Sequence, residues 1–588
     1  MGDAGGKQSD GATRRLVAGD DRSRPCGRPC RRKPRLSEPV RLEDMCRRRR
    51  LQVLPDPPHL AEPFRSDEDL VGHAYALSRE TSVKTPYDTD ERDGRPNAPR
   101  CRSQGGGRVS RSVARGTMLG IAGQVWHLAA AFLLYAFLAR KLGPAKFGDW
   151  RLALSILNWF ELFVNAGLVK VATKAIAERP EERPSTIRGA YLGQMVLAAV
   201  LFVGALVLAG PVAASLRDPD LAFLLRVSAL DIPLYAAFMV AAAVLLGVQR
   251  FERHAFGMSV YATAKLLAVG GLVWFGFSVP GALLGNTIAS IVGFAATFTP
   301  WPRKSEGAFA DAVSQAKTMG PASVPFLTQN LLEGLAASMD LWFLKRLVGS
   351  SAVVGLYGGA ATLAEVPVFL FIGLNRALFP SIARVHAEGD TYMAHRFTRQ
   401  GVRLALLVTV LGVGVIAATG EQALTLVYSA SFAAIAGPLA VLMAAACAKT
   451  VWSVCTEVLM AEDRRRTALG IIVGALVVQV ALLAALTRLY GAMGAAVAVA
   501  IASAGAATVS LLMLRDAFGA RMLLTGGRAV LAAGVVGGVL WWIDPQPIAL
   551  LVLYPLAAVV YVGLLWMLGE VEADDVRSIR GAFGRRGA

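Results

Sequence analysis

The sequence lacks the motifs by which membrane enzymes usually drive or catalyse reactions. It contains no G-x-x-x-x-G-K-[S/T] phosphate-binding motif, so the chain is not expected to hydrolyse ATP itself. Only six of its 588 residues are cysteines. Cys26 and Cys30 have no second Cys or His pair nearby to complete a zinc site, and no disulfide framework is indicated. We therefore expect no enzyme activity, catalytic residue, metal or organic cofactor.

The first 115 residues also lack tryptophan and any long apolar run. They are rich in Arg, Pro, Gly, Asp and Glu, and cannot bury enough apolar surface to offset the entropy of the chain. We therefore expect 1–115 to be a disordered basic tail. Few aromatic residues lie among basic clusters such as Arg47–Arg50, which favours a solvated or membrane-surface tail over nucleic-acid binding. An alternative is that translation begins at Met118, which sequencing of the mature N-terminus would test.

From Gly116 onward the chain is a succession of apolar runs, each long enough to cross a bilayer as a helix. Dividing these runs at charged or Pro/Gly-rich positions predicts an all-α polytopic membrane protein with about fourteen transmembrane helices. The predicted spans cover residues 116–139, 150–173, 188–210, 224–248, 256–278, 280–300, 320–344, 352–380, 400–419, 433–460, 467–487, 490–514, 527–543 and 546–568.

Lys and Arg residues are concentrated in the even-numbered loops between these spans, as in Arg464–Arg466. Because positively charged loops stay on the cytoplasmic side, both termini are predicted to be cytoplasmic and the protein to lie in the cytoplasmic membrane. The odd-numbered loops would then face outward. They are too short to carry a catalytic domain, which argues against a membrane glycan polymerase or ligase.

One unusual turn occurs twice in the sequence. LARKLGPAKFGDWRLALS begins at Leu138 and LKRLVGSSAVVGLYGGAA begins at Leu344. Each copy has a basic pair and a leucine, then two glycines with a spacer between them, then an aromatic residue. These glycines and aromatic residues are Gly143, Gly148 and Trp150 in the first copy and Gly349, Gly355 and Tyr357 in the second.

Two further matches recur in the same order at nearly the same offset, which indicates an internal duplication. Residues 244–250 match 458–464, and residues 281–290 match 494–503. A duplicated unit of six spans enters the membrane in the same direction twice, so its copies are related by an axis along the membrane normal. We therefore predict two six-helix bundles with pseudo-twofold symmetry. The predicted divisions are 116–305 and 306–515 for the bundles, 516–569 for an extra helix pair and 570–588 for a cytoplasmic tail.

Several short motifs resemble those of the polysaccharide-export flippases of the multidrug/oligosaccharidyl-lipid/polysaccharide exporter superfamily. The turn Leu138–Trp150 resembles that family's A-R-x-L-G-P-x-x-Y/F-G motif, and Leu378–Arg384 resembles its F-P-x-S/A-R exit from span eight. Asp340 occupies the place of its D-x-x-x-L motif, and Tyr428–Phe432 is similar to its Y-G-x-x-F loop, with Ser429 in place of the glycine. The resemblance extends over roughly residues 116–515.

This resemblance implies a bacterial flippase that moves an oligosaccharide on undecaprenyl pyrophosphate across the cytoplasmic membrane by alternating access, for surface polysaccharide biosynthesis. It implies a cavity lined mainly by spans one, two, seven and eight. Its implied partners are the lipid-linked glycan, membrane lipids, and the polysaccharide polymerase and glycosyltransferases of the same pathway, without nucleic acid. A multidrug exporter and a lipid II flippase of the same superfamily remain alternatives. Transport would be driven by H⁺ or Na⁺, or by downhill lipid flow.

Charged residues inside membrane spans are costly and are therefore candidates for function. Lys265, Arg376 and Lys449 lie inside apolar runs, and cations are what a lipid pyrophosphate requires. The structural alternative is that these side chains reach the headgroups or pair with buried carboxylates.

Polar residues recur on single helix faces and are candidates for binding sugar hydroxyls or a coupling ion. They are Gln124 and His127 in span one, Asn158, Glu161 and Asn165 in span two, Asn330, Glu333 and Asp340 in span seven, and Glu365 in span eight. The same residues could instead hold helices together through hydrogen bonds.

Overall fold

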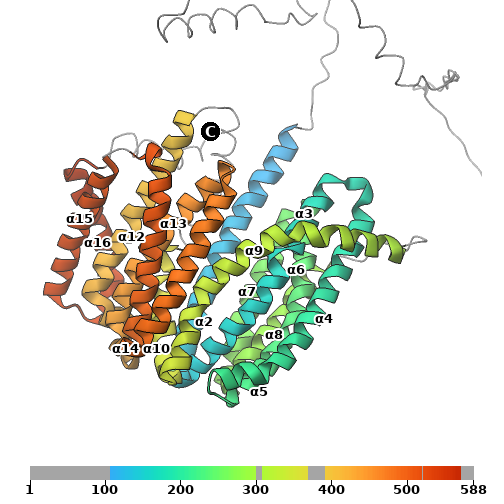
Figure 1. Cartoon of the computed structure of the whole chain (residues 1–588), viewed down its shortest axis with the longest axis horizontal. Coiled ribbons are helices and arrows are strands. Elements are labelled where there is room, and N and C mark those ends of the chain that lie inside the picture. Colours follow the sequence, from blue (N-terminus) through green and yellow to red (C-terminus); the bar gives the residue numbers. More distant parts are fainter. Residues whose placement is uncertain (1–105, 299–307, 369–390, 519–520, 571–588) are drawn as a thin grey trace, which may run out of the picture. The chain divides into compact units, whose positions relative to one another are not determined.

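The computed structural model describes residues 106–298, 308–368, 391–518 and 521–570, all of which belong to one compact unit. Within these ranges the protein consists of α-helices joined by short turns (Figure 1). The predicted division at 305/306 and the tail 571–588 lie outside the described residues. The first described helix begins at Gly106, ahead of the predicted first span.

The described residues 106–298, which we call the first part of the chain, form seven α-helices and one 3₁₀ turn. They are α2 (Gly106–Ala166), α3 (Leu168–Glu178), η2 (Pro180–Glu182), α4 (Arg183–Ser215), α5 (Asp220–Ala229), α6 (Asp231–Gly247), α7 (Phe251–Trp274) and α8 (Ser278–Thr297). The described remainder contains α9 (Ala308–Val348), α10 (Ser351–Ala364), α12 (Thr391–Val427), η3 (Ala430–Ile435), α13 (Ala436–Ala461), α14 (Arg465–Met513), η4 (Arg515–Ala517), α15 (Arg521–Ile543), η5 (Pro547–Ala549) and α16 (Leu550–Met567).

The described ranges include 11 helical stretches that are long and apolar enough to cross a membrane, which confirms a multi-pass membrane protein. Two of them bend sharply at a glycine, at Gly143 in α2 and at Gly491 in α14, where φ is 71° and 55°. Glycine adopts positive φ without a Cβ penalty, so each long helix divides there into two arms. The bends lie near the predicted limits of spans one and two and of spans eleven and twelve. The count of fourteen spans and the two six-helix bundles stay predictions.

The repeated turn has the same backbone feature in both copies. Gly143 has φ 71° and Gly349 has φ 78°, so both first glycines adopt a conformation that other residues rarely reach. In the first copy Pro144 follows directly; proline is favoured at the first position of a helix because its fixed φ suits the helix and its missing N–H is not needed there. The chain thus passes from one arm of α2 to the other with no loop between them.

The two copies of the turn contact each other where the second arm of α2 packs against α10. A Cβ atom built on Gly148 would collide with the backbone carbonyl oxygen of Ser351, and one built on Gly355 would collide with that of Pro144. Only glycine allows the two backbones to approach this closely. The second glycine of each copy is therefore required by the crossing of the two helices.

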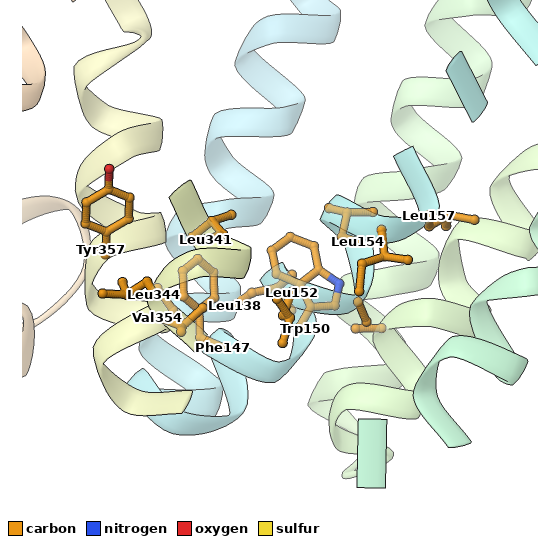
Figure 2. Close-up of a cluster of buried hydrophobic side chains, with 14 of the residues drawn as sticks. Leu138, Phe147, Trp150, Leu152, Leu154, Leu157, Leu341, Leu344, Val354 and Tyr357 are labelled. Carbon is orange, nitrogen blue, oxygen red and sulfur yellow. The ribbon is translucent and has the colours of Figure 1, made fainter. Parts of the chain in front are cut away.

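Aromatic residues fill the space around this crossing. Trp150 and Tyr357, the equivalent aromatics of the two copies, are fully buried. Figure 2 shows Phe147, Trp150 and Tyr357 with leucines and a valine of α2, α9 and α10 in one buried cluster. The Phe147 ring centroid lies 6.3 Å from that of Tyr428 and 5.9 Å from that of Phe432. The Tyr428–Phe432 motif thus packs onto the turn Leu138–Trp150.

Charged groups also join the two parts of the chain at the end that holds Gly143 and Gly349, which we call the turn end. Lys345 Nζ lies 2.6 Å from Asp218 Oδ2, and these side chains are 4% and 19% exposed. The same ammonium donates to Ser351 Oγ at 2.6 Å. The Arg140 guanidinium donates to the backbone carbonyls of Leu426 and Val427. In this conformation the turn end is therefore held closed by the buried contacts of Lys345 and the exposed contacts of Arg140.

The C-terminal helices α15 and α16 pack against α12. Their anchor is the buried Glu570 carboxylate, which accepts hydrogen bonds from Arg403 Nε at 3.0 Å, Arg528 Nη1 at 3.0 Å and Thr525 Oγ1 at 2.7 Å. The Tyr561 hydroxyl donates to the Leu407 carbonyl oxygen at 2.9 Å. These contacts fix the last helix pair to the preceding helices.

The hydrogen-bond pattern of the span formed by α5 and α6 is interrupted at Leu230, although this residue keeps helical angles, with φ −57° and ψ −25°. Pro233 lies in the first turn of α6 and has no N–H to donate to the Ala229 carbonyl, so the regular hydrogen bonds of a helix cannot continue through this point. Accordingly α5 ends at Ala229 and α6 begins at Asp231. The break places an acidic side chain at the start of a helix inside a membrane span.

Candidate functional site

A polar cavity of about 260 Å³ lies between α2, α9, the end of α10 and α13. Its polar lining residues are Tyr135, Arg151, Ser155 and Asn158 of α2, Ser338 and Asp340 of α9, Glu365 at the end of α10, and Lys449 of α13. Two cations and two carboxylates therefore share one small cavity whose walls come from both parts of the chain.

The second arm of α2 presents its polar residues to the cavity because of their spacing. Arg151, Ser155 and Asn158 follow one another at intervals of four and three residues, which places them on one face of the helix. The intervening Leu152 and Leu154 are buried in the hydrophobic cluster of Figure 2. The same arm thus anchors the helix with one face and lines the cavity with another.

Asp340 is the most fully engaged charged group of the cavity. Its side chain is 7% exposed. Oδ1 accepts from the Leu341 backbone N–H at 2.9 Å, and Oδ2 accepts from the Tyr357 hydroxyl at 2.9 Å. Because Tyr357 belongs to the repeated turn, the cavity carboxylate is held in place by the crossing of α2 and α10. These two donors occupy one acceptor site on each oxygen.

The Arg151 side chain is held by Tyr135 and Gly358. Its Nη1 donates to the Tyr135 hydroxyl at 3.0 Å, and the guanidinium carbon lies 5.1 Å from the centroid of the Tyr135 ring. Its stem packs on Gly358, where a Cβ would lie 3.2 Å from Nε. The Arg151 Nε is buried and has no hydrogen-bond partner in the structure. An arginine beside a cavity with an unused donor is suited to binding an oxygen of an anionic ligand.

Lys449 supplies the second cation of the cavity and lies within electrostatic reach of Asp340. Of the residues predicted from the sequence, the cavity brings together Asn158, Asp340, Glu365 and Lys449. Arg376 and the motif Leu378–Arg384 lie outside the described residues.

Lys265 lies in a different group, within the first part of the chain. Its Nζ is 5.8 Å from the centroid of the Tyr261 ring, and the His127 ring stacks on the same tyrosine at 6.3 Å. Lys265 and Glu161 are within electrostatic reach of each other. The structure thus places Lys265 beside a carboxylate and away from Lys449 and its cavity.

The remaining predicted residues are distributed over other surfaces. Gln124 and Asn165 are exposed on α2, and Asn330 is partly buried on α9. Glu333 is exposed and, like Lys170, lies within electrostatic reach of Glu457. Within the described ranges, no group of three or more His, Cys, Asp or Glu residues is placed to hold a metal ion.

Two kinds of functional candidates escaped the sequence reasoning. Arg151 is not among the residues predicted from the sequence, because the predicted second span begins only one residue before it and the residue lies next to the basic turn. Asp231 and Asn286 lie inside predicted spans 224–248 and 280–300 but were not selected. An acidic residue two positions before a proline inside an apolar run was the available signal for the first of these.

Comparison with known proteins identifies relatives of this chain. Residues 113–386 match the family described as polysaccharide biosynthesis protein. A succinoglycan biosynthesis transport protein, ExoT of Rhizobium meliloti (strain 1021), is 24% identical over 258 residues, which are 43% of this chain and 50% of that protein. The match thus spans about half the length of that relative.

Solved structures share the fold at low sequence identity. The lipid II flippase MurJ in an inward closed conformation superimposes with a TM-score of 0.64 and 12% identity, covering 77% of this chain and 98% of MurJ. An inward-facing multidrug resistance transporter of the MATE family has a TM-score of 0.56 and 15% identity, covering 68% of this chain and 95% of that protein. The helical architecture is therefore that of these transporters, which confirms the resemblance first seen in the motifs.

Proposed function

We propose that the chain is a member of the multidrug/oligosaccharidyl-lipid/polysaccharide exporter superfamily and that it is a flippase for a lipid-linked oligosaccharide used in surface polysaccharide biosynthesis. We propose undecaprenyl pyrophosphate as the lipid carrier and the cytoplasmic membrane as the location, with H⁺ or Na⁺ as the coupling ion. The polysaccharide family match and the succinoglycan transport relative support this choice within the superfamily.

The observation that carries the proposal is the pair of cations in the polar cavity. A pyrophosphate diester carries negative charge on both phosphates, and Arg151 and Lys449 can bind its oxygens as a fork and as a point charge. Each Asp340 oxygen accepts one hydrogen bond from a neutral donor, which fixes the position of this carboxylate beside the two cations. Ser155, Asn158 and other hydroxyl or amide groups of the wall can then bind sugar hydroxyls.

The cavity volume limits what the present conformation can hold. Pockets that enclose a drug-sized ligand measure about 300–1,000 Å³, whereas this cavity measures about 260 Å³. It therefore accommodates the pyrophosphate and the nearest sugar at most. A longer glycan requires the two parts of the chain to separate.

Alternating access gives a role to the contacts at the turn end. In the present conformation the Lys345–Asp218 pair and the close crossing at Gly148 and Gly355 hold this end shut. Release of substrate there requires these contacts to break while the opposite end closes, which is the rocking motion of two-part transporters.

Two alternatives remain from the same superfamily. A multidrug exporter would use Asp340 and Glu365 to bind an organic cation, and both carboxylates do line the cavity. A lipid II flippase would bind the same pyrophosphate and differ only in the sugars that it accepts.

The test is thermal unfolding of the full-length protein in lipid nanodiscs with three ligands in separate arms: undecaprenyl pyrophosphate, lipid II and tetraphenylphosphonium. A ligand that binds only the folded state, at a concentration of a hundred times its Kd, stabilises it by about 2.7 kcal/mol. We expect the pyrophosphate to stabilise the wild-type protein and to lose this effect in Lys449→Ala. Lys174→Ala, which removes an exposed lysine, is the matched control.

Stabilisation by tetraphenylphosphonium alone would support the multidrug exporter and contradict the proposal. Much stronger stabilisation by lipid II than by undecaprenyl pyrophosphate would favour the peptidoglycan-precursor flippase. A pyrophosphate effect that is equal in Lys449→Ala and in the wild type would remove the cavity as its binding site.

A further inference from the structure

A second group of buried polar side chains surrounds the break between α5 and α6, and the mechanism above does not use it. Asp231 at the start of α6 is 1% exposed, and Asn286 and Ser290 on α8 are 1% and 0% exposed. The last two are one helical turn apart, and α6 packs against α8. The Ser290 hydroxyl lies beside the Asp231 carboxylate.

These three side chains carry polar atoms with no hydrogen-bond partner in the structure. The atoms on which this is clearest are Asp231 Oδ1 and Asn286 Oδ1 and Nδ2, whereas the Ser290 hydroxyl has the Asp231 carboxylate beside it. Nearly all buried polar atoms in native proteins are paired with protein, water or an ion. Three such atoms on two neighbouring side chains, inside a membrane span, indicate a binding site for a small ligand.

The helix break adds a further oxygen to the same region. Because Pro233 has no N–H, the Ala229 carbonyl lacks its regular helical donor two residues before Asp231. Discontinuous membrane helices are used by transporters to bring backbone carbonyls and side chains to an ion. With one exception, the Asn286 Nδ2, the unpaired atoms are oxygens, and oxygen ligands suit a hard cation.

The nearby charges determine the valence of that cation. Glu161 of α2 and Lys265 of α7 both lie within electrostatic reach of Asp231. The other titratable groups around them are His127, Tyr235 and Tyr261. When these three groups are neutral and both carboxylates are ionised, the two carboxylates and one ammonium leave one negative charge uncompensated. A buried net charge within a membrane is costly, and one monovalent cation removes it.

We propose that Asp231, Asn286 and Ser290 form a monovalent-cation site that binds Na⁺, with H⁺ competing for the Asp231 carboxylate, and that Lys265 is the fixed counter-charge of Glu161. The site lies in the first part of the chain, apart from the cation-lined cavity. Its role as the coupling site of transport rests on the proposed function, whereas cation binding itself does not.

The experiment measures thermal unfolding of the full-length protein in nanodiscs of neutral lipid, without any glycan lipid. NaCl, KCl and N-methyl-D-glucamine chloride are titrated at equal ionic strength, at two pH values one unit apart. We expect a saturable stabilisation that is specific to Na⁺, with an apparent Kd up to about tenfold higher at the lower pH because the proton competes. Asp231→Asn should raise this Kd at least about tenfold, because a charge-assisted contact is lost.

Asp463→Asn is the matched control, since it makes the same change on a carboxylate that is 94% exposed, and it should leave the Na⁺ response unchanged. Ser290→Ala removes only one hydroxyl oxygen and provides the same comparison if Asp231→Asn does not fold. A pH response that depends on Asp231, in the absence of a Na⁺ effect, would show only that the carboxylate is protonated and would contradict the proposed Na⁺ site.

Two results would overturn the proposal. One is a Na⁺ effect of equal size in the wild type, Asp231→Asn and Ser290→Ala, because it would place the cation elsewhere. The other is equal stability in all three salts at both pH values, because it would show that the folded protein binds no Na⁺ at this site. Neither result depends on whether the protein carries a glycan lipid, so failure of this site and failure of the proposed function can be told apart.

Discussion

Replacing Gly148 by alanine should destabilise the protein, although alanine is the better helix former. The added Cβ would collide with the Ser351 carbonyl oxygen and lie 2.8 Å from the Gly355 backbone nitrogen. Overpacking of this kind costs about 1–3 kcal/mol. The upper end applies because the obstructing atoms belong to a backbone and cannot rotate away. The gain in helix propensity, up to about 1 kcal/mol, offsets only part of this cost.

Gly204→Ala in α4 is the matched control, because nothing lies within 4 Å of a Cβ at that position. There only the propensity gain operates, and the variant should be as stable as the wild type or more stable. The two variants should therefore differ by about 2–3 kcal/mol, or at least tenfold in the unfolding equilibrium constant. The measurement is unfolding of the purified protein in mixed micelles with increasing SDS. Equal midpoints for the two variants would refute the close backbone crossing.

Three further variants test the polar contacts. Lys449→Ala should abolish most glycan-lipid translocation into liposomes while Lys449→Arg retains more of it; wild-type transport by the alanine variant would contradict the cavity assignment. Lys345→Met should lower the free energy of unfolding by about 2–3 kcal/mol. This is less than the roughly 3–5 kcal/mol expected for breaking a fully buried ion pair, because the Asp218 side chain is 19% exposed. An unchanged midpoint of SDS unfolding would show that the turn end is not held by this pair. Glu570→Gln should increase amide hydrogen exchange in α15 and α16 relative to the other helices, because Arg403 loses its carboxylate partner; uniform exchange would mean that the helix pair is anchored by its apolar face.

The helices and the repeated turn could be predicted because their signals are local. Apolar run length fixes a membrane helix, and the Gly143–Pro144 pair marks a bend at a definite residue. The sequence did not indicate that the bend is so tight. Because α2 resumes directly after Gly143, Arg151 lies well inside a helix and lines the cavity, although the predicted second span begins only at residue 150. Lys345 lies one residue beyond the predicted seventh span, but α9 continues to Val348 and the lysine side chain is buried.

The partners of the charged residues could not be predicted because they depend on distances between helices. Lys265 and Lys449 look alike in the sequence, each a lone cation in an apolar run. Packing places Lys265 near Glu161 and Asp231, and places Lys449 in the polar cavity. The importance of Asn286 depends on an unpaired amide facing a region that only the folded protein contains.

The crossing of α2 and α10 has the geometry of an interface between identical subunits. Gly148 and Gly355 hold the same place in their respective copies of the turn, and each lies against the other. In a twofold symmetric dimer, residues meet their own counterparts only next to the axis. A side chain at this position in a single ancestral unit would thus have met its own copy. The predicted duplication would divide that self-contact between two positions, Gly148 and Gly355, and the space available at each still depends on the other.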